Sequence, residues 1–275
     1  MDRILLIDGL NSIWRANIAF KPGEKTEPSF VIVYNFFRNL RATIEEFEPT
    51  KVFFCLEGSD NFRHKLFPDY KGNRTVKTAA TADRKNLDDF YRQADIIVKL
   101  ISSLPITTVR ADKFECDDVI ASLAENLKEE EVIVISNDSD FIQLLQKDYK
   151  NFKIYNPFTK TYMTAPEYHY LTWKCLAGDK RTDNIPGLVG PGAAEKLATN
   201  IDKFAEFMGT HEHRSNYSLN KELIELKMIH MDDLQFTEHH VNYNLLKEEF
   251  AKMDCKSMLT EKYWDKFCET FSTLR

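Results

Sequence analysis

The sequence lacks long apolar runs and paired cysteines, and each absence excludes a class of protein. No apolar stretch approaches the roughly 18 residues that a membrane-spanning helix needs. Only four consecutive apolar residues precede Asp8, which is too few for the apolar region of a signal peptide. The five cysteines form no C-x-x-C pair, so we expect reduced thiols without a disulfide framework or a zinc site. These absences predict a cytoplasmic protein with no membrane partner.

A general excess of basic residues is also missing, because the chain carries a net charge of -6. The charges are unevenly distributed, however, and residues 61–85 hold seven Lys or Arg against two Asp. Where the charges lie matters more for nucleic-acid binding than their sum does. The acidic total therefore does not exclude a DNA substrate, above all if bound metal ions offset some of the carboxylates.

The first 160 residues alternate between apolar runs and helical patterns. Four runs rich in Val, Ile and Phe are expected to be buried strands: residues 4–8, 52–58, 106–111 and 132–138. Apolar residues recur at helical spacing from Phe30 to Phe47, and Pro49 ends that pattern. Further helices are expected at 87–104 and 115–129, and an edge strand at 152–159. This alternation predicts an α/β fold with a parallel sheet flanked by helices.

After Pro166 the sequence shows helical patterns separated by Gly and Pro, with no convincing strand. We therefore expect an α/β domain over residues 1–165 and a helical part over residues 166–275. The segment "DNIPGLVGPGAAEKLA" (183–198) sets glycines and prolines around a few apolar residues before a helix start, which is typical of a hairpin between two helices.

Carboxylates follow all four predicted strands. They are Asp8, Glu57, Glu115, Asp117, Asp118, Asp138 and Asp140. Because the carboxyl ends of parallel strands meet at one edge of a sheet, these acids should share a crevice. A turn or a helix cap explains any one of them equally well, but not so many at one edge.

Like charges this close destabilise a fold unless cations neutralise them. Oxygen ligands without nearby His or Cys favour Mg²⁺ or Mn²⁺ over Zn²⁺. The sequence therefore predicts a divalent metal site, and two ions about 4 Å apart would suit phosphodiester hydrolysis.

Five ordered motifs carry a resemblance to a known family: "LIDGLN", "FPDYKGNR", "ECDDVIA", "SNDSDF" and "AGDKRTDNIPGLVGPGAAEKL". Together they resemble the structure-specific 5′ nucleases, which include flap endonucleases, the 5′ nuclease domain of bacterial DNA polymerase I and phage 5′–3′ exonucleases. The compact length is most similar to phage members such as the T-even phage ribonuclease H. The resemblance covers about residues 1–200 and implies a PIN-like domain with a helical DNA-binding part.

The resemblance also implies roles for the acids. Asp8, Glu115, Asp117 and Asp138 match ligands of the tighter metal site, with Asp118 and Asp140 beside them. Asp179 and Asp183 match acids that serve the second metal. Two departures stand out: Glu57 replaces the usual Asp, and Asp179 and Asp183 are four residues apart, where the family usually has three. The first departure puts the geometry of Glu57 towards a metal in question, and the second leaves open a weaker second metal.

Residues 61–95 match the family's helical arch or clamp, which holds a 5′ single strand. Lys71 and Arg74 match residues that contact the scissile phosphate, and we count them with Asp138 as catalytic. Arg63 lies in the same basic segment and is expected to bind DNA. Tyr70 is expected either to stack on a base or to pack against Phe67.

The hairpin is expected to bind duplex DNA. Backbone N–H groups near Gly187, Gly190 and Gly192 suit phosphate oxygens, and Lys196 is placed to add a further contact. The resemblance also implies K⁺ at the carbonyls of the turn. An ordinary glycine-rich turn is the alternative.

The sequence thus predicts a monomeric, Mg²⁺-dependent 5′ nuclease, with Mn²⁺ able to substitute. It would act as a 5′–3′ exonuclease and flap endonuclease on DNA with a 5′ flap or end, and on RNA/DNA primer duplexes, in primer removal or repair. A single-strand-binding or other replication protein is a further partner left open. The alternatives are a catalytically weakened junction-binding protein and a PIN-type ribonuclease.

Overall fold

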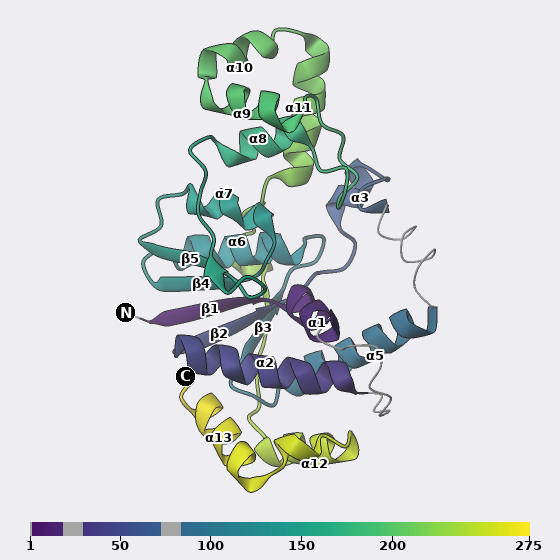
Figure 1. Cartoon of the computed structure of the whole chain (residues 1–275), viewed down its shortest axis with the longest axis vertical. Helices are drawn as coiled ribbons and strands as arrows, with labels where there is room; N and C mark the ends of the chain where they lie inside the picture. The colour runs from purple at the N-terminus through teal and green to yellow at the C-terminus, as the bar shows by residue number, and fades with distance from the viewer. Residues whose placement is uncertain (1, 19–29, 73–83) are drawn as a thin grey trace.

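The fold is built around one seven-stranded sheet, seen in a computed structural model that describes residues 2–18, 30–72 and 84–275 (Figure 1). The strand order is β6-β5-β4-β1-β2-β3-β7. Five strands run parallel: β1 (Arg3–Asp8), β2 (Lys51–Cys55), β3 (Thr107–Arg110), β4 (Glu131–Ile135) and β5 (Asn151–Asn156). The short strands β6 (Thr161–Tyr162) and β7 (Gln235–Thr237) pair antiparallel at the two edges.

The central strands bury both of their faces, as their apolar runs predict. In β1, Leu5 and Ile7 belong to one core, whereas Ile4 and Leu6 belong to the core on the opposite face. Alternate residues of a strand point to opposite faces, so one apolar run can supply two cores. The predicted parallel sheet is therefore confirmed. The strand expected at 152–159 is not at the edge, because β6 extends the sheet beyond it.

Helices cover both faces of the sheet (Figure 1). The first core packs against α1 (Gly9–Ile18), α2 (Val31–Phe47) and α5 (Arg84–Ile101), and the second against α6 (Cys116–Asn126) and α7 (Ile142–Leu145). A left-handed Glu48 ends α2 just before Pro49. A short helix, α3 (Phe62–Leu66), starts the basic segment, and a 3-10 turn, Ser139–Phe141, follows β4.

A helical lobe stands at the top of Figure 1, on the side of the sheet that α6 and α7 cover. It consists of α8 (Tyr170–Ala177), α9 (Pro191–Thr199), α10 (Ile201–Phe207) and α11 (His211–Ile224). A small third core joins this lobe to the segment after α3, because Tyr70 packs with Cys175, Ile185 and Leu223. The lobe therefore rests on the part of the molecule that carries the predicted acids.

The chain after the lobe returns to the sheet. It forms a 3-10 turn (Met231–Asp233), β7, α12 (Tyr243–Lys252), a second turn (Lys256–Met258) and α13 (Glu261–Ser272). Phe250 of α12 lies 5.1 Å from Phe37 of α2 between ring centroids, and Phe267 and Phe271 complete the same core. The expectation of no strand after Pro166 is wrong, because β7 pairs with β3.

None of the helices in the described part of the chain combines the length and the apolar character needed to cross a bilayer.

Candidate metal and nucleic-acid site

Asp8 ends β1 at the carboxyl edge of the sheet and is only 6% exposed. Its Oδ1 accepts the backbone N–H of Asn11 at 3.1 Å, and its Oδ2 accepts the hydroxyl of Ser136 at 2.9 Å. Burial raises the pKa of Asp8 to about 6, and the negative charges of Asp138 and Glu57 add to the rise. A cation at this edge would therefore stabilise the ionised carboxylate.

Asp117 and Asp138 are close enough to Asp8 to affect its electrostatics. Asp117 lies in the first turn of α6, where burial raises its pKa and the charges of Asp138 and Asp8 raise it further. Asp138 also caps the following 3-10 turn, since its Oδ1 accepts the N–H of Asp140 at 2.9 Å. The cap explains the position of Asp138 in the sequence but not its place among other carboxylates.

The acids fit a divalent cation by their chemistry. Within the described residues, no group of three or more His, Cys, Asp or Glu side chains is already arranged to hold a metal ion. Asp8 and Asp117 nevertheless offer oxygen donors, as Mg²⁺ and Mn²⁺ prefer, and their raised pKa values reflect a repulsion that an ion would relieve. An ion would have to draw these side chains together.

Glu115 precedes α6 and is held by three donors. Its Oε1 accepts the ammonium of Lys71 at 2.5 Å and the amide of Asn61 at 2.7 Å, while Oε2 accepts the hydroxyl of Tyr70 at 3.0 Å. Burial alone would raise the pKa of Glu115, but the charges of Lys71 and Arg63 hold it below its usual value. Glu115 is therefore an ionised carboxylate beside Asp8, Asp117 and Asp138, which together are called the Asp8 cluster.

Lys71 joins the basic segment to the acids. Its backbone N–H donates to the carbonyl of Asp183 at 2.9 Å, and its φ of 56° is in the left-handed region. From this position the side chain of Lys71 reaches Glu115. The second expected phosphate contact, Arg74, lies outside the described residues.

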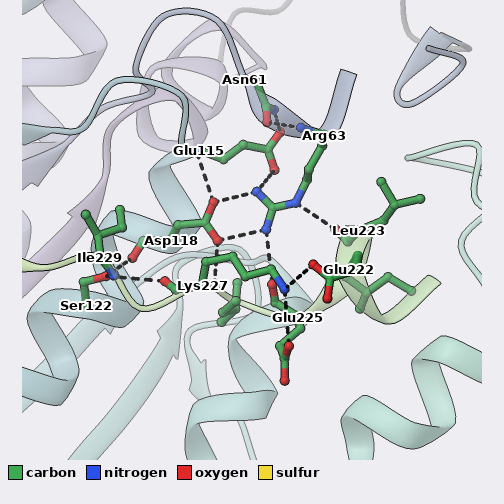
Figure 2. A network of polar contacts seen from close by, with 12 residues as sticks. Asn61, Arg63, Glu115, Asp118, Ser122, Glu222, Leu223, Glu225, Lys227 and Ile229 are labelled. Atoms are coloured by element: carbon green, nitrogen blue, oxygen red, sulfur yellow. Dashed lines mark hydrogen bonds and ion pairs between the residues drawn. The ribbon is translucent and has the colours of Figure 1, made fainter. Parts of the chain in front are cut away.

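Asp118 has a different role from the predicted one (Figure 2). It is fully buried, and its two oxygens accept Nη1 and Nη2 of Arg63 at 2.5 and 2.8 Å. The backbone N–H groups of Glu115 and Lys227 donate to the same carboxylate at 3.1 and 2.8 Å. These four donors saturate Asp118, so its assignment as a metal ligand is wrong.

Arg63, the partner of Asp118, also has a role different from the predicted one. Its side chain is 2% exposed, and its Nε donates to the carbonyl of Leu223 at 2.8 Å (Figure 2). A guanidinium enclosed in this way cannot reach a phosphate backbone, so the expected DNA contact is wrong. Arg63 instead joins α3, α6 and the end of α11. Sequence reasoning missed this pair because its partners are 55 residues apart.

Tyr70 is also buried, with 3% of its surface exposed. It packs in the third core, with Phe67 against it, and burial raises the pKa of its hydroxyl well above the usual value. Stacking on a base is therefore excluded, and packing against Phe67 is confirmed. The tyrosine supports Glu115 through its hydroxyl.

Lys174 is a functional candidate that sequence reasoning missed. It lies in α8, and its side chain is 8% exposed. Its ammonium donates to Oδ1 of Asp140, and lies 3.1 Å from Oδ2 of Asp179. Burial raises the pKa of Asp140 to about 7, although the charge of Lys174 acts against that rise. The only signal in the sequence was a lysine one turn before the "GD" motif.

Asp179 and Asp183, in the loop after α8, lie close to Lys174 and Asp140. The four-residue spacing forms a turn in which the N–H of Asp183 donates to the carbonyl of Asp179 at 3.2 Å. Asp179 accepts the backbone N–H of Thr182 at 3.0 Å and also its hydroxyl. The buried Asp183 is close enough for its charge to raise the pKa of Asp140. The three acids thus form a second group beside the Asp8 cluster.

Glu57 lies two residues beyond the end of β2 and is exposed. Its charge contributes to the raised pKa of Asp8, so it is near the cluster but on the solvent side.

The hairpin between α8 and α9 has glycines of two kinds. A Cβ on Gly187 would meet the carbonyl oxygen of Ala177 at 2.1 Å, whereas a Cβ on Gly190 or Gly192 would meet nothing within 4 Å. The N–H groups of Leu188 and Val189 donate to the carbonyl of Leu176. Gly187 therefore has a packing role, and the open side of the hairpin is at Gly190 and Gly192, with Lys196 exposed one turn further on.

The amino-acid sequence is similar to those of known nucleases and polymerases. A family model described as "5′-3′ exonuclease, N-terminal resolvase-like domain" matches residues 3–170. DNA polymerase I of Treponema pallidum is 31% identical over 245 residues, covering 82% of this chain and 23% of that protein. The 5′-3′ exonuclease of Bacillus subtilis is 31% identical over 215 residues, covering 72% of this chain and 68% of that protein. The chain thus spans about a quarter of the polymerase relatives.

Solved structures support the same fold. The bacteriophage T5 D15 flap endonuclease, crystallised as a variant with DNA and metal ions, has a TM-score of 0.64 at 18% identity, with 98% of each chain covered. The T5 5′-exonuclease with bound zinc has a TM-score of 0.61, also at 18% identity. Together with the family model, these likenesses confirm the predicted α/β architecture.

Proposed function

Since the chain belongs to the family of 5′–3′ exonucleases with an N-terminal resolvase-like domain, we propose that it is a divalent-metal-dependent 5′ nuclease. The family is the one that the five motifs predicted. The observation that carries the proposal is the meeting of Asp8, Asp117 and Asp138 at one sheet edge, where the charge of Asp138 raises the pKa of both Asp8 and Asp117. Such a site favours the entry of cations.

Asp8, Asp117, Asp138 and Glu115 would hold the first ion, and Asp140, Asp179 and Asp183 face the second position. Mg²⁺ fits this oxygen-only donor set, and Mn²⁺ would substitute for it. Bound ions would activate water and neutralise charge on the phosphate during phosphodiester hydrolysis. The residues of the chain then have to position the substrate and control its charge.

Lys71 is proposed to change partners when the site is loaded. In the described state its ammonium bonds to Glu115. If Glu115 shares its charge with an ion, its hold on Lys71 weakens, and the ammonium can turn to neutralise the scissile phosphate. Asn61 and Tyr70 donate to the two oxygens of Glu115, so that carboxylate can keep both hydrogen bonds when Lys71 leaves it.

The proposed substrate is DNA with a 5′ flap or end, and RNA primers on DNA. The support comes from the basic residues 61–85, which begin beside the acids, and from the exposed face of the hairpin at Gly190, Gly192 and Lys196. Backbone and lysine contacts of this kind position a duplex without reading its sequence. K⁺ at the carbonyls of the turn and a replication protein as partner are further parts of the proposal.

The test is cleavage of an end-labelled 5′-flap duplex, with and without Mg²⁺, by the wild type and Asp138→Asn. We expect Mg²⁺-dependent cuts near the junction in the wild type. The variant should lose cleavage by about a hundredfold or more, as expected when a central ligand is lost, while still binding the flap. Wild type that binds the flap without cutting it in either Mg²⁺ or Mn²⁺ would overturn the proposal in favour of a junction-binding protein.

A further inference from the structure

Lys174 lies where a second metal ion would be expected. Its ammonium is between Asp140, from the turn after β4, and Asp179, from the loop after α8. All three side chains are largely buried, with exposed fractions of 8%, 14% and 16%. Buried lysines are rare unless they are paired, so these two carboxylates account for the position of this one.

A lysine ammonium and a hydrated divalent ion compete for the same oxygens. An ammonium is a compact charge that donates up to three hydrogen bonds. Mg²⁺ would need the same carboxylate oxygens at about 2.1 Å, inside the volume that Nζ occupies. An ion at this position would have to displace Lys174 or remain further from Asp140 and Asp179.

We propose that Lys174 serves as a built-in cation at the second metal position, so that the protein binds one divalent ion tightly and a second only weakly. This inference rests on the proposed function, because it assumes that the Asp8 cluster holds the first ion. It is specific to the charge of Lys174 and to Asp140 and Asp179, its two partners. The negative charge of Asp183 remains close by, so entry of the second ion is weakened and not abolished.

The proposal also gives Lys174 a role in orienting the helical lobe. The ammonium of Lys174 contacts both Asp140 and Asp179. Asp140 follows β4 of the sheet, and Asp179 lies in the hairpin between α8 and α9. A divalent ion bridging the same acids would have this effect only when it is bound. The lysine does so without an ion, so the second group of acids is ordered before any metal arrives.

The test is a Mn²⁺ titration of the full chain at fixed neutral pH, with free Mn²⁺ followed by electron paramagnetic resonance. We expect one tight ion in the wild type and two in Lys174→Met, where affinity at the second position should rise about tenfold or more. Lys174→Arg keeps the charge and should behave as the wild type. Lys153→Met is the matched control, because Lys153 is half exposed on β5 and pairs with Glu131.

Each outcome decides the proposal. If Lys174→Met fails to fold, Lys174→Gln is used instead, because it removes the charge but keeps a hydrogen-bond donor. Equal Mn²⁺ stoichiometry and affinity in the wild type and the neutral variants would overturn the role of Lys174. A wild type without any bound Mn²⁺ would overturn the proposed metal-dependent function. In that case, Mn²⁺ bound only by Lys174→Met or Lys174→Gln would still support the competition between Lys174 and an ion. No bound Mn²⁺ in the wild type or in these variants would refute that competition.

Discussion

At the scale of single residues, Glu115 stays ionised although it is buried. Lys71, Asn61 and Tyr70 supply the donors that water would otherwise provide. A buried carboxylate without such donors would take up a proton instead. Lys71, Asn61 and Tyr70 therefore keep Glu115 charged in the absence of an ion.

The first prediction concerns Lys71. We expect Lys71→Ala to reduce the single-turnover cleavage rate of a 5′-flap duplex by about a hundredfold or more, because the cation proposed for the scissile phosphate is gone. The dissociation constant for the same flap should change much less. Lys65→Ala is the control, since Lys65 lies in the same basic segment but is exposed and pairs with Asp60. Equal losses in both variants would refute a specific role for Lys71.

The second prediction concerns pH. The folded-state pKa of Asp8 is raised to about 6 and that of Asp140 to about 7, above the unfolded value. Groups raised in this way contribute stability below their unfolded pKa, and this stability is lost as pH rises through the folded pKa. In EDTA, the melting temperature should therefore fall between pH 5 and pH 8, by about 5 °C.

Added Mg²⁺ should reverse that loss, because ions bind the deprotonated carboxylates. The rise in melting temperature caused by Mg²⁺ should be larger at pH 8 than at pH 5. Asp8→Asn should flatten the pH dependence in EDTA. A melting temperature in EDTA that is unchanged across this range would contradict the raised pKa values of Asp8 and Asp140.

The third prediction separates Asp118 from the metal ligands. Asp118→Asn leaves the charge of Arg63 buried without its carboxylate, and we expect a loss of about 3–5 kcal/mol in the free energy of unfolding by urea. Asp112→Asn is the control, because Asp112 is fully exposed. Mn²⁺ affinity should change little under conditions where the variant is folded. Loss of Mn²⁺ binding at unchanged stability would restore Asp118 as a ligand.

At the scale of elements, the hairpin between α8 and α9 contains one glycine that is packed, Gly187, and another that is open to solvent, Gly192. Gly187 fits against the backbone of α8, whereas Gly192 is open to solvent in the first turn of α9. The two positions are five residues apart and differ in what surrounds them. They can therefore separate the folding of the hairpin from its contact with DNA.

The fourth prediction compares these two glycines. Gly187→Ala should lower the free energy of unfolding by about 1–3 kcal/mol, because the new methyl group overlaps a carbonyl oxygen. Gly192→Ala should leave stability unchanged, and it should weaken duplex binding if that surface faces phosphates. Urea unfolding and fluorescence anisotropy with a labelled duplex measure the two effects. Similar stability in both variants would contradict the packing role of Gly187.

At the scale of the whole molecule, residues 235–274 belong to the sheet domain and not to the lobe that precedes them. The aromatic residues of α12 and α13 complete the core over α2. This placement makes the buried aromatic residues of α12 and α13 part of the core of the sheet domain. Loss of their packing should therefore affect the stability of the entire fold.

The fifth prediction tests that placement. Phe250→Ala should lower the free energy of unfolding by about 3–5 kcal/mol and keep a single cooperative transition. Phe158→Ala is the control, since Phe158 is 48% exposed. Chemical denaturation followed by fluorescence and by circular dichroism measures both. A separate early transition in Phe250→Ala would mean that α12 and α13 unfold independently of the sheet.

Much of the fold could be predicted because strands buried on both faces leave continuous apolar runs, as β1 and β4 do. The strand β7 could not be predicted, since three exposed residues at an edge carry almost no pattern. The carboxylates of the candidate site could be predicted from the sequence because they directly follow the predicted strands. The pairing of Arg63 with Asp118 and the position of Lys174 were not, because both depend on contacts between distant segments.

The return of the chain to the sheet has a consequence for synthesis. A ribosome releases the acids, the basic segment and the hairpin before it releases β7, α12 and α13. The core over α2 cannot close until residue 274 has emerged, since Phe250, Phe267 and Leu274 all belong to it. The nascent chain therefore carries every proposed ligand before it has a complete core to hold them, and residues 235–274 decide when that core closes.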